Sequence, residues 1–188
     1  MHIKAVEKYL YHKRWLKVGK SVILCRIITK TTLFFIMISF LGEYESTIDT
    51  KGRFLLPAAF KKQLPIDDSA QFVINRGFEK CLTLYPQQSW NPIFANISNL
   101  NDFDPKVRAF RRYFLNGASP VELDSAGRLL LPKNLMAHAS LEKDIVLVSA
   151  LNKIEIWDKK VYEQFFDSMT DQSFSDLANE VMNRKIEG

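Results

Sequence analysis

The decapeptide IDTKGRFLLP, residues 48–57, recurs seventy-five positions later as LDSAGRLLLP, residues 123–132. Both copies contain Asp, Gly, Arg, a run of apolar residues and Pro in the same order. Reuse of this many positions at one fixed separation indicates that the chain contains one structural unit twice. The two decapeptides therefore decide how the rest of the sequence is divided.

Each decapeptide predicts a β-hairpin. Asp49 and Asp124 can accept backbone N–H groups across a tight turn, and Gly52 and Gly127 tolerate the positive φ that such a turn requires. The arginine after each glycine starts the return strand, so its guanidinium group is expected beside the hairpin tip, within reach of a partner. For a single copy, a common turn with a solvated arginine would be the preferred explanation. The duplication favours a shared function.

The surrounding pattern predicts an α+β chain that is rich in strands. Apolar runs between turn residues predict strands over residues 40–48, 53–56, 71–75, 80–85, 121–123, 128–131, 145–149 and 154–157. Helical periodicity and proline positions predict helices over residues 57–64, 90–97, 133–137 and 158–166, from Pro105 onwards, and around Phe174, Leu177 and Val181 with Ser173 as the cap.

The helix from Pro105 separates apolar from basic residues. One face of this helix carries Val107, Phe110 and Phe114. Another face carries Arg108, Arg111 and Arg112. Such a basic face is either solvated or a set of phosphate contacts, and the sequence leaves both possibilities open.

Charge is distributed unevenly along the chain. The sequence has 26 Lys and Arg residues against 21 Asp and Glu residues, which gives a net charge of +5. Residues 1–36 contain eight basic residues and one acidic residue, so residues 37–188 have a slight net negative charge. A nucleic acid would therefore have to be attracted by a local basic patch, because the overall charge of residues 37–188 would repel it.

Residues 1–36 form a distinct leader. Their apolar run over residues 33–41 is shorter than the stretch of about 20 residues that a transmembrane helix needs. Extending this run back to Val22 would place Arg26 and Lys30 inside the bilayer, which is unfavourable. Three interpretations stay open: translated sequence upstream of a true start at Met37, a basic arm that is amphipathic or disordered, and a targeting segment without a clear cleavage site.

The sequence offers few groups for catalysis or metal binding. Cys25 and Cys81 are too few and too far apart for a disulfide framework or a zinc site, so reduced thiols are expected. Of the three histidines, only His138 lies after residue 36, and no phosphate-binding loop or dinucleotide fingerprint occurs. We therefore expect a protein that is not an enzyme and that uses no catalytic residue, metal, cofactor or small-molecule substrate.

From Met37 onwards the chain resembles the MraZ family of bacterial transcriptional regulators, which is a tandem form of the AbrB-like DNA-binding unit. The resemblance rests on both hairpins and on the stretches FLGEY, residues 40–44, and RRYFLNGA, residues 111–118. It covers about four fifths of the sequence. It implies a first repeat with a linker helix over residues 37–115 and a second repeat with a C-terminal helix over residues 116–188.

This resemblance implies a fold and a function that the residue pattern alone does not give. The fold would be a double-split, swapped-hairpin β-barrel of the AbrB-like kind, built from two tandem repeats related by a pseudo-twofold axis, with flanking helices. Family members form rings and bind short direct repeats in the promoter ahead of their own gene, in the division and cell-wall gene cluster. They are cytoplasmic and associate with the nucleoid. The expected partners are thus double-stranded DNA and further copies of the chain, with no membrane partner.

The expected DNA contacts lie at the hairpin tips. Arg53 and Arg128 are expected to read guanine or to clamp phosphates, because a guanidinium group suits both. The other expected site residues are Lys51 as a phosphate contact, Asp49 and Asp124 as residues that orient the turn, and Gly52 and Gly127 within it, with Arg108, Arg111 and Arg112 as further phosphate contacts. Ala126 replaces the lysine of the first copy, so the two hairpins are not expected to contribute equally.

Self-association is expected to supply the affinity, because one subunit with few cations would bind weakly and linked contacts reinforce one another.

Two other functions remain open. A membrane-associated scaffold would use the leader as an anchor, and an AbrB-like antitoxin would need a toxin-binding tail.

Overall fold

The computed structural model of the chain describes residues 16–18, 21–23, 39–64 and 71–183. It divides the chain into two units, residues 1–37 and 38–188. In the first unit, β1 (Leu16–Val18) and β2 (Ser21–Ile23) form a small antiparallel sheet. The interpretations given above for the leader fall almost entirely outside the described residues. Within these described ranges, no helix is both long and apolar enough to cross a bilayer.

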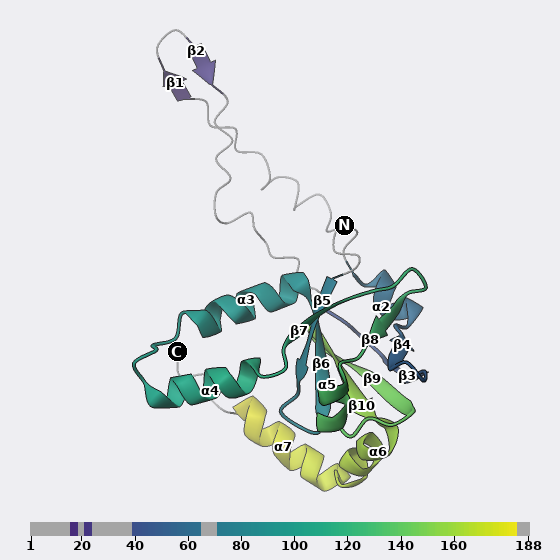
Figure 1. Cartoon of the computed structure of the whole chain (residues 1–188). Helices are drawn as coiled ribbons and strands as arrows, with labels where there is room; N and C mark the ends of the chain where they lie inside the picture. The colour runs from purple at the N-terminus through teal and green to yellow at the C-terminus, as the bar shows by residue number, and fades with distance from the viewer. Residues whose placement is uncertain (1–15, 19–20, 24–38, 65–70, 184–188) are drawn as a thin grey trace, which may run out of the picture. The chain divides into compact units, whose positions relative to one another are not determined.

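The second unit runs through one series of elements twice (Figure 1). The first series is β3 (Glu43–Thr47), β4 (Arg53–Leu55), α2 (Ala58–Lys62), β5 (Gln71–Arg76), β6 (Cys81–Pro86), α3 (Gln87–Ser98) and α4 (Pro105–Leu115). The second is β7 (Ser119–Glu122), β8 (Arg128–Leu130), α5 (Lys133–His138), β9 (Asp144–Ala150), β10 (Lys153–Asp158), α6 (Lys159–Asp167) and α7 (Asp171–Asn183).

Every strand and helix predicted from the sequence overlaps one of these elements. The Asp158 side chain caps α6, as the pattern suggested, by accepting the Lys160 N–H at 3.0 Å. The predicted cap of the last helix was wrong, because α7 already begins at Asp171. There the Thr170 hydroxyl accepts the Ser173 N–H at 3.2 Å, so the capping oxygen lies three residues earlier.

The strands of the two repeats are interleaved in one antiparallel sheet. Its order is β3-β9-β10-β6-β5-β7. β3 of the first repeat pairs with β9 of the second, and β7 of the second pairs with β5 of the first. β6 and β10 meet at the centre, where Thr83 lies opposite Glu155. Neither repeat can therefore complete the sheet alone.

β4 and β8 form a separate two-stranded ribbon whose register reflects the duplication. Phe54 lies opposite Leu129, and these two residues hold the same position in the two decapeptides. On either side, Arg53 lies opposite Leu130 and Leu55 lies opposite Arg128. The repeats are thus related by an approximate twofold axis that passes between Phe54 and Leu129.

The prediction of a closed barrel is wrong. The six-stranded sheet ends at β3 on one side and at β7 on the other, and among the described strands none links the two. The physical reason is the length of β4 and β8, which have three residues each and pair with one another. β4 has no strand ladder with β3, to which it is joined by the isolated bridge between Ile48 and Phe54 and by a hydrogen bond from the Ser46 hydroxyl to the Leu55 carbonyl. No continuous ladder therefore runs around the core.

The sheet is covered on both faces. On one face lie the ribbon, α2 and α5, whose Phe54, Leu129, Phe60 and Leu135 are almost completely buried. The sheet contributes the fully buried Phe72, Ile74, Leu82, Leu84, Ile145, Leu147, Ile154 and Ile156 to this core. α3, α4 and α6 pack on the other face, around Val73, Tyr85, Trp90 and Trp157.

Cys81 lies in the interior of the sheet. Its thiol is fully buried, and burial raises the pKa of Cys81 to about 12. A thiol with so high a pKa forms little thiolate and is chemically unreactive. Cys81 therefore serves packing.

Both edges of the six-stranded sheet carry residues that hinder a further strand. β7 contains Pro120, which has no N–H to donate. β3 carries Glu43, whose carboxylate accepts the Tyr162 hydroxyl, and Glu45, which pairs with Lys159 at 2.8 Å. Proline and charged side chains on an edge both disfavour pairing with another chain.

Replacing Phe54 with alanine is expected to lower the free energy of unfolding by about 3–5 kcal/mol, because a buried ring is removed and a cavity remains. Urea denaturation followed by circular dichroism measures this change. Leu55→Ala is the matched control, since Leu55 is 51% exposed on the same strand. It should change stability by about 0.5 kcal/mol at most. Equal effects of the two substitutions would contradict the central place given to the ribbon.

Candidate nucleic-acid interface

The two hairpin tips are built by the same set of hydrogen bonds. Asp49 Oδ1 accepts the backbone N–H groups of Lys51 and Arg53, both at 2.9 Å. Asp124 Oδ1 likewise accepts two backbone N–H groups of its own turn at 2.9 Å. Gly52 and Gly127 have φ values of +80° and +75°, which side chains rarely adopt. The turns are therefore built as the sequence predicted, with Asp as acceptor and Gly at the positive φ.

Each arginine is paired with the aspartate of its own turn. Arg53 donates through Nε and Nη2 to Asp49 Oδ2, at 2.9 and 2.7 Å. Arg128 makes the same two contacts with Asp124 Oδ2, both at 2.8 Å. The arginine side chains nevertheless remain 26% and 36% exposed. Within the described part of the chain neither Nη1 has a hydrogen-bond partner, so each guanidinium group keeps donors for another molecule.

These pairs hold both carboxyl groups in the charged form. The hydrogen bonds from the Arg53 side chain and backbone lower the pKa of Asp49 to about 2. The backbone N–H of Arg128, followed by its guanidinium group, lowers the pKa of Asp124 as well. A hydrogen bond or a positive charge favours the ionised carboxylate. Both ion pairs therefore persist at neutral pH.

The two arginines lie on one outer surface. Directly opposed residues of an antiparallel pair point to the same side, so Arg53, Leu55, Arg128 and Leu130 share the side of the ribbon that faces away from Phe54 and Leu129. We call these four residues the hairpin face. Leu55 and Leu130 are 51% and 56% exposed on it. Diagonal positions of such a ribbon are about 7–8 Å apart, so both arginines can meet one ligand.

Each tip is held in place by the other repeat. The Gly52 carbonyl accepts the Leu131 N–H at 2.9 Å, and the Gly127 carbonyl accepts the Leu56 N–H at 3.2 Å. These bonds connect the turn of one hairpin to the residue that follows the return strand of the other. The distance between the two tips is consequently fixed by the backbone.

A lysine lies at each tip, but the two lysines come from different elements of the chain. The first tip carries the exposed Lys51 and borders a hollow of about 550 Å³ that Lys133 and Met136 of α5 also line. The second tip has Ala126 instead, but a Cβ atom placed on Gly127 would lie 2.6 Å from the Lys61 ammonium group. Lys61 of α2 therefore supplies the second tip with the positive charge that its own turn lacks.

Lys61 and Lys133 were missed by the sequence reasoning, as were the leucines of the hairpin face. Lys61 lies eight residues beyond Arg53 but serves the tip that contains Arg128. Only the exchange of strands between repeats brings it there. The sequence holds only an indirect signal for these residues. Lys61 and Met136 occupy equivalent positions in the two repeats, so assuming that each hairpin packs on the helix of the other repeat would have placed both at the tips.

The arginines of α4 have other contacts. The Arg111 guanidinium group donates to the carbonyls of Ile97 and Leu100, at 3.1 and 2.9 Å, and pairs with Asp102. Arg108 donates to the Asp102 carbonyl at 2.7 Å. Both thus fix the turn between α3 and α4, while Arg112 is exposed.

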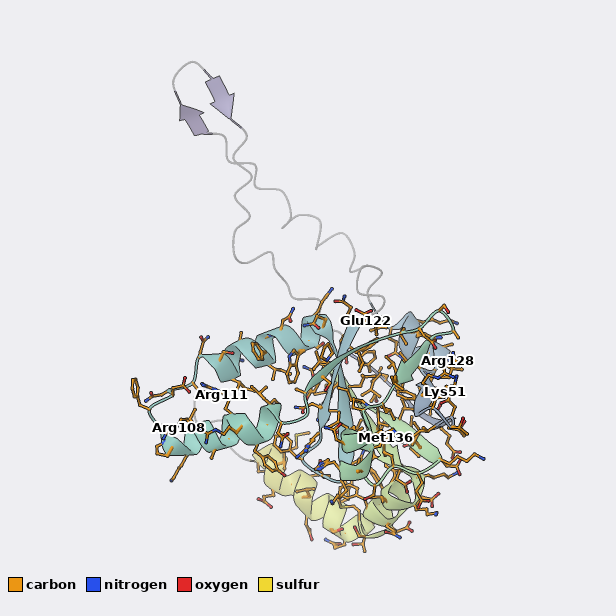
Figure 2. All side chains as sticks on the ribbon, viewed as in Figure 1. Lys51, Arg108, Arg111, Glu122, Arg128 and Met136 are labelled. Atoms are coloured by element: carbon orange, nitrogen blue, oxygen red, sulfur yellow. The ribbon has the colours of Figure 1, made fainter. Side chains whose placement is uncertain are left out.

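The α4 arginines also lie far from the hairpin face. Figure 2 shows Arg108 and Arg111 on the opposite side of the sheet from Lys51 and Arg128. The structure therefore does not bring the two predicted groups of basic residues together.

Among the described residues, no group of three or more His, Cys, Asp or Glu side chains could hold a metal ion.

Comparison with known proteins gives the family. The family model described as "MraZ protein, putative antitoxin-like" matches residues 39–113 and again residues 114–185. A protein of Cytophaga hutchinsonii named transcriptional regulator MraZ is 50% identical over 126 residues, which cover 67% of this chain and 83% of that protein.

Two further relatives with the same name cover more of the chain. The protein of Christiangramia forsetii is 48% identical over 147 residues, which are 78% of this chain and 94% of the relative. The protein of Thermoanaerobacter sp. is 39% identical over 146 residues, which are 78% of this chain and 99% of the relative. Both the duplicated architecture and these similarities show that the chain belongs to the MraZ family.

Proposed function

We propose that this chain is a DNA-binding transcriptional regulator that contacts duplex DNA through its hairpin face as a homo-oligomer. The relatives named transcriptional regulators support the class of function. The observation that carries the proposal is the placement of two partly exposed arginines on one surface of a ribbon that both repeats build. Such a surface presents two guanidinium groups with free donors to one partner, and the lysines beside it supply positive charge on a body whose net charge is slightly negative.

The arginines suit the reading of bases better than the attraction of phosphates. Each guanidinium group is already neutralised by its aspartate, so contact with a phosphate gains little Coulomb energy. Guanine O6 and N7 are uncharged acceptors that a guanidinium edge can hold in the major groove. The aspartate meanwhile limits the rotamers of the arginine, which reduces the entropy lost on binding.

The lysines supply the attraction to the backbone of the duplex. Lys51, Lys61 and Lys133 surround the two tips, and the structure gives none of their ammonium groups an ion pair within the described residues. Each neutralised phosphate contributes about −0.9 to the salt dependence of log K. In this proposal Arg53 and Arg128 select the sequence, whereas the lysines set the affinity.

Assembly of several subunits makes this contact selective. One hairpin face neutralises few phosphates, and linking several faces along one duplex makes the later contacts intramolecular. We therefore propose that the protein binds, as a ring-like homo-oligomer, to short direct repeats upstream of its own operon, in the division and cell-wall gene cluster. It would act in the cytoplasm, associated with the nucleoid. Residues 37–115 and 116–188 would act together within each subunit, since they exchange strands.

Arg53→Ala and Arg128→Ala are each expected to weaken binding to the upstream DNA by about 10- to 100-fold, as the loss of a bidentate guanine contact removes about 1–3 kcal/mol. Gel shifts with the upstream duplex and with a shuffled duplex of equal length measure affinity and selectivity. The oligomer should elute unchanged in gel filtration. Lys160→Ala, on α6, is the control, and retained selectivity in both arginine variants would overturn the assignment.

Lys61→Ala is expected to weaken binding to all duplexes alike, because Lys61 serves the second tip as Lys51 serves the first. This substitution should reduce the magnitude of the slope of log K against log salt by about 0.9. Fluorescence anisotropy at several salt concentrations measures this slope. Lys62→Ala tests whether any lysine of α2 has the same effect, and it should not. A normal slope for Lys61→Ala would remove Lys61 from the interface.

The ion pair of the first tip should stabilise the fold in a defined pH range. The pKa of Asp49 falls from an ordinary 3.8 to about 2 in the folded chain, so the pair contributes fully above about pH 5 and is lost as the pH falls from about 4 towards 2. The difference in Tm between the wild type and Asp49→Asn should be constant from pH 8 to 5 and shrink below pH 4. Asp144→Asn is the control. A difference that already disappears above pH 5 would contradict the depressed pKa.

A further inference from the structure

Two helical pairs follow the last strand of each repeat, and they are packed differently. α3 and α4 form the first pair, in which Phe114 stacks on Trp90 with ring centroids 6.0 Å apart. α6 and α7 form the second pair. No described residue of α7 is buried, although Phe174, Leu177 and Val181 share one face of the helix and are 63%, 46% and 54% exposed. α4 has no fully buried residue either, but its Phe114 is only partly exposed against Trp90, so the apolar face of α7 has less cover than that of α4.

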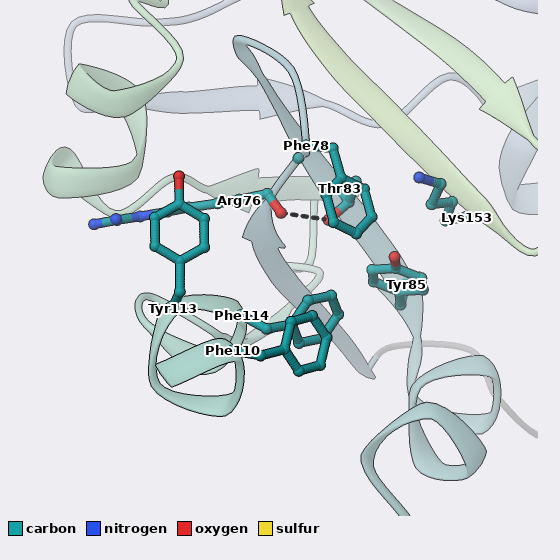
Figure 3. Close-up of a pocket in the computed structure, with 9 residues that line it drawn as sticks. Arg76, Phe78, Thr83, Tyr85, Phe110, Tyr113, Phe114 and Lys153 are labelled. Carbon is teal, nitrogen blue, oxygen red and sulfur yellow. Dashed lines mark hydrogen bonds between the residues drawn. The ribbon is translucent and has the colours of Figure 1, made fainter. Parts of the chain in front are cut away.

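The first helical pair offers an apolar hollow at its surface. Phe78, Phe110 and Tyr113 border it and are 80%, 43% and 67% exposed. Figure 3 shows the rings of Phe110 and Phe114 next to each other, with Arg76 and Tyr113 to one side and Tyr85 and Lys153 to the other. The hollow has a volume of about 70 Å³. This is the space of roughly five water molecules, enough for one aliphatic side chain.

The two helical pairs carry opposite charge. α4 exposes Lys106 and Arg112, which have no hydrogen-bond or ion-pair partner for their side chains among the described residues, and Arg76 lines the hollow that Tyr113 of α4 also borders. The second pair exposes the acidic residues Glu163, Asp167, Asp171 and Asp176, none of which has an ion-pair partner among the described residues. Its two lysines, Lys159 and Lys160, are already paired with Glu45 and Glu142. The second pair therefore presents an outward negative charge and the first an outward positive charge.

We infer that α7 of one copy docks on the first helical pair of another copy, with an apolar side chain of α7 entering the hollow beside Tyr113. This inference rests on the self-association that the proposed function requires. Exposed aromatic rings form the centre of the contact and opposite charges surround it, which is the usual arrangement of a specific interface.

The contact joins two different surfaces of the chain. Such a head-to-tail contact leaves each copy with one unused surface of each kind, so further copies add until the assembly closes into a ring or continues as a filament. The first helical pair lies on the opposite side of the sheet from the hairpin face, as Figure 2 shows for Arg108 and Lys51. Docking of a neighbour therefore leaves the DNA-contacting surface of each subunit accessible.

Two charge-reversed variants of the full chain test the inference. One is Lys106→Glu with Arg112→Glu, and the other is Asp167→Lys with Asp176→Lys. All four side chains are exposed, so the fold should tolerate the changes, which circular dichroism checks. In the first variant alone the two surfaces carry the same charge, and in the second variant alone most of the negative charge that attracts α4 is removed. In an equal mixture of the variants, every contact between unlike copies again joins opposite charges.

Light scattering coupled to gel filtration measures the assemblies. The wild type is expected to elute as a multiple of the 21.8 kDa chain, and each variant alone should need at least tenfold higher concentration to assemble. The mixture should recover the wild-type mass. Leu177→Asp should also prevent assembly, whereas the control Leu41→Asp, at a side chain that is 72% exposed elsewhere, should not.

Three results would count against the inference, and they separate it from the proposed function. Variants that assemble like the wild type, or a mixture that stays dissociated, would overturn the docking of α7 while leaving DNA binding intact. A wild-type chain that is monomeric at all concentrations would overturn both the docking and the self-association. Gel shifts on the dissociated variants test whether assembly supports DNA binding. These variants should bind the duplex at least tenfold more weakly than the wild type. Wild-type affinity would show that assembly does not support binding.

Discussion

The pairing of β4 with β8 is the interaction on which the rest of the structure depends. It places Phe54 against Leu129 at the centre of the core, so the two repeats share one interior. The same three-residue strands turn Arg53 and Arg128 towards solvent, because side chains alternate along a strand. Stability and the candidate interface therefore have a common origin, and the core could not be loosened at this point without disturbing the spacing of the arginines.

On the hairpin face, a neighbouring carboxylate balances the positive charge of each arginine. A carboxylate beside each guanidinium group prevents two neighbouring cations from repelling one another, and it keeps the arginines in one orientation before any partner arrives. The unpaired charge at the tips comes from lysines, whose long side chains adapt to the position of a phosphate. In the proposed contact with DNA, the rigid arginines would discriminate and the flexible lysines would attract, and the two kinds of group are held by different elements.

The sequence predicted those features that depend on neighbouring residues. Asp49, Gly52 and Arg53 act within one turn, so their geometry followed from residue chemistry, and the order of strands and helices followed from periodicity. Closure of the sheet could not be judged, because it depends on which distant strands pair. The place of Lys61 depends on the same exchange of strands. Arg111 was ambiguous for another reason, since a guanidinium group binds carbonyls at a helix end as readily as it binds phosphate.

The proline and carboxylates at the sheet edges have a consequence for the proposed assembly of many copies. An open sheet with bare backbone at its borders could recruit extended segments from neighbouring or partly unfolded molecules, which is the first step of fibrous aggregation. Pro120 removes a donor at one border, and the occupied side chains of Glu43 and Glu45 screen the other. If many copies gather at one promoter, as proposed, these edges would help them to stay folded.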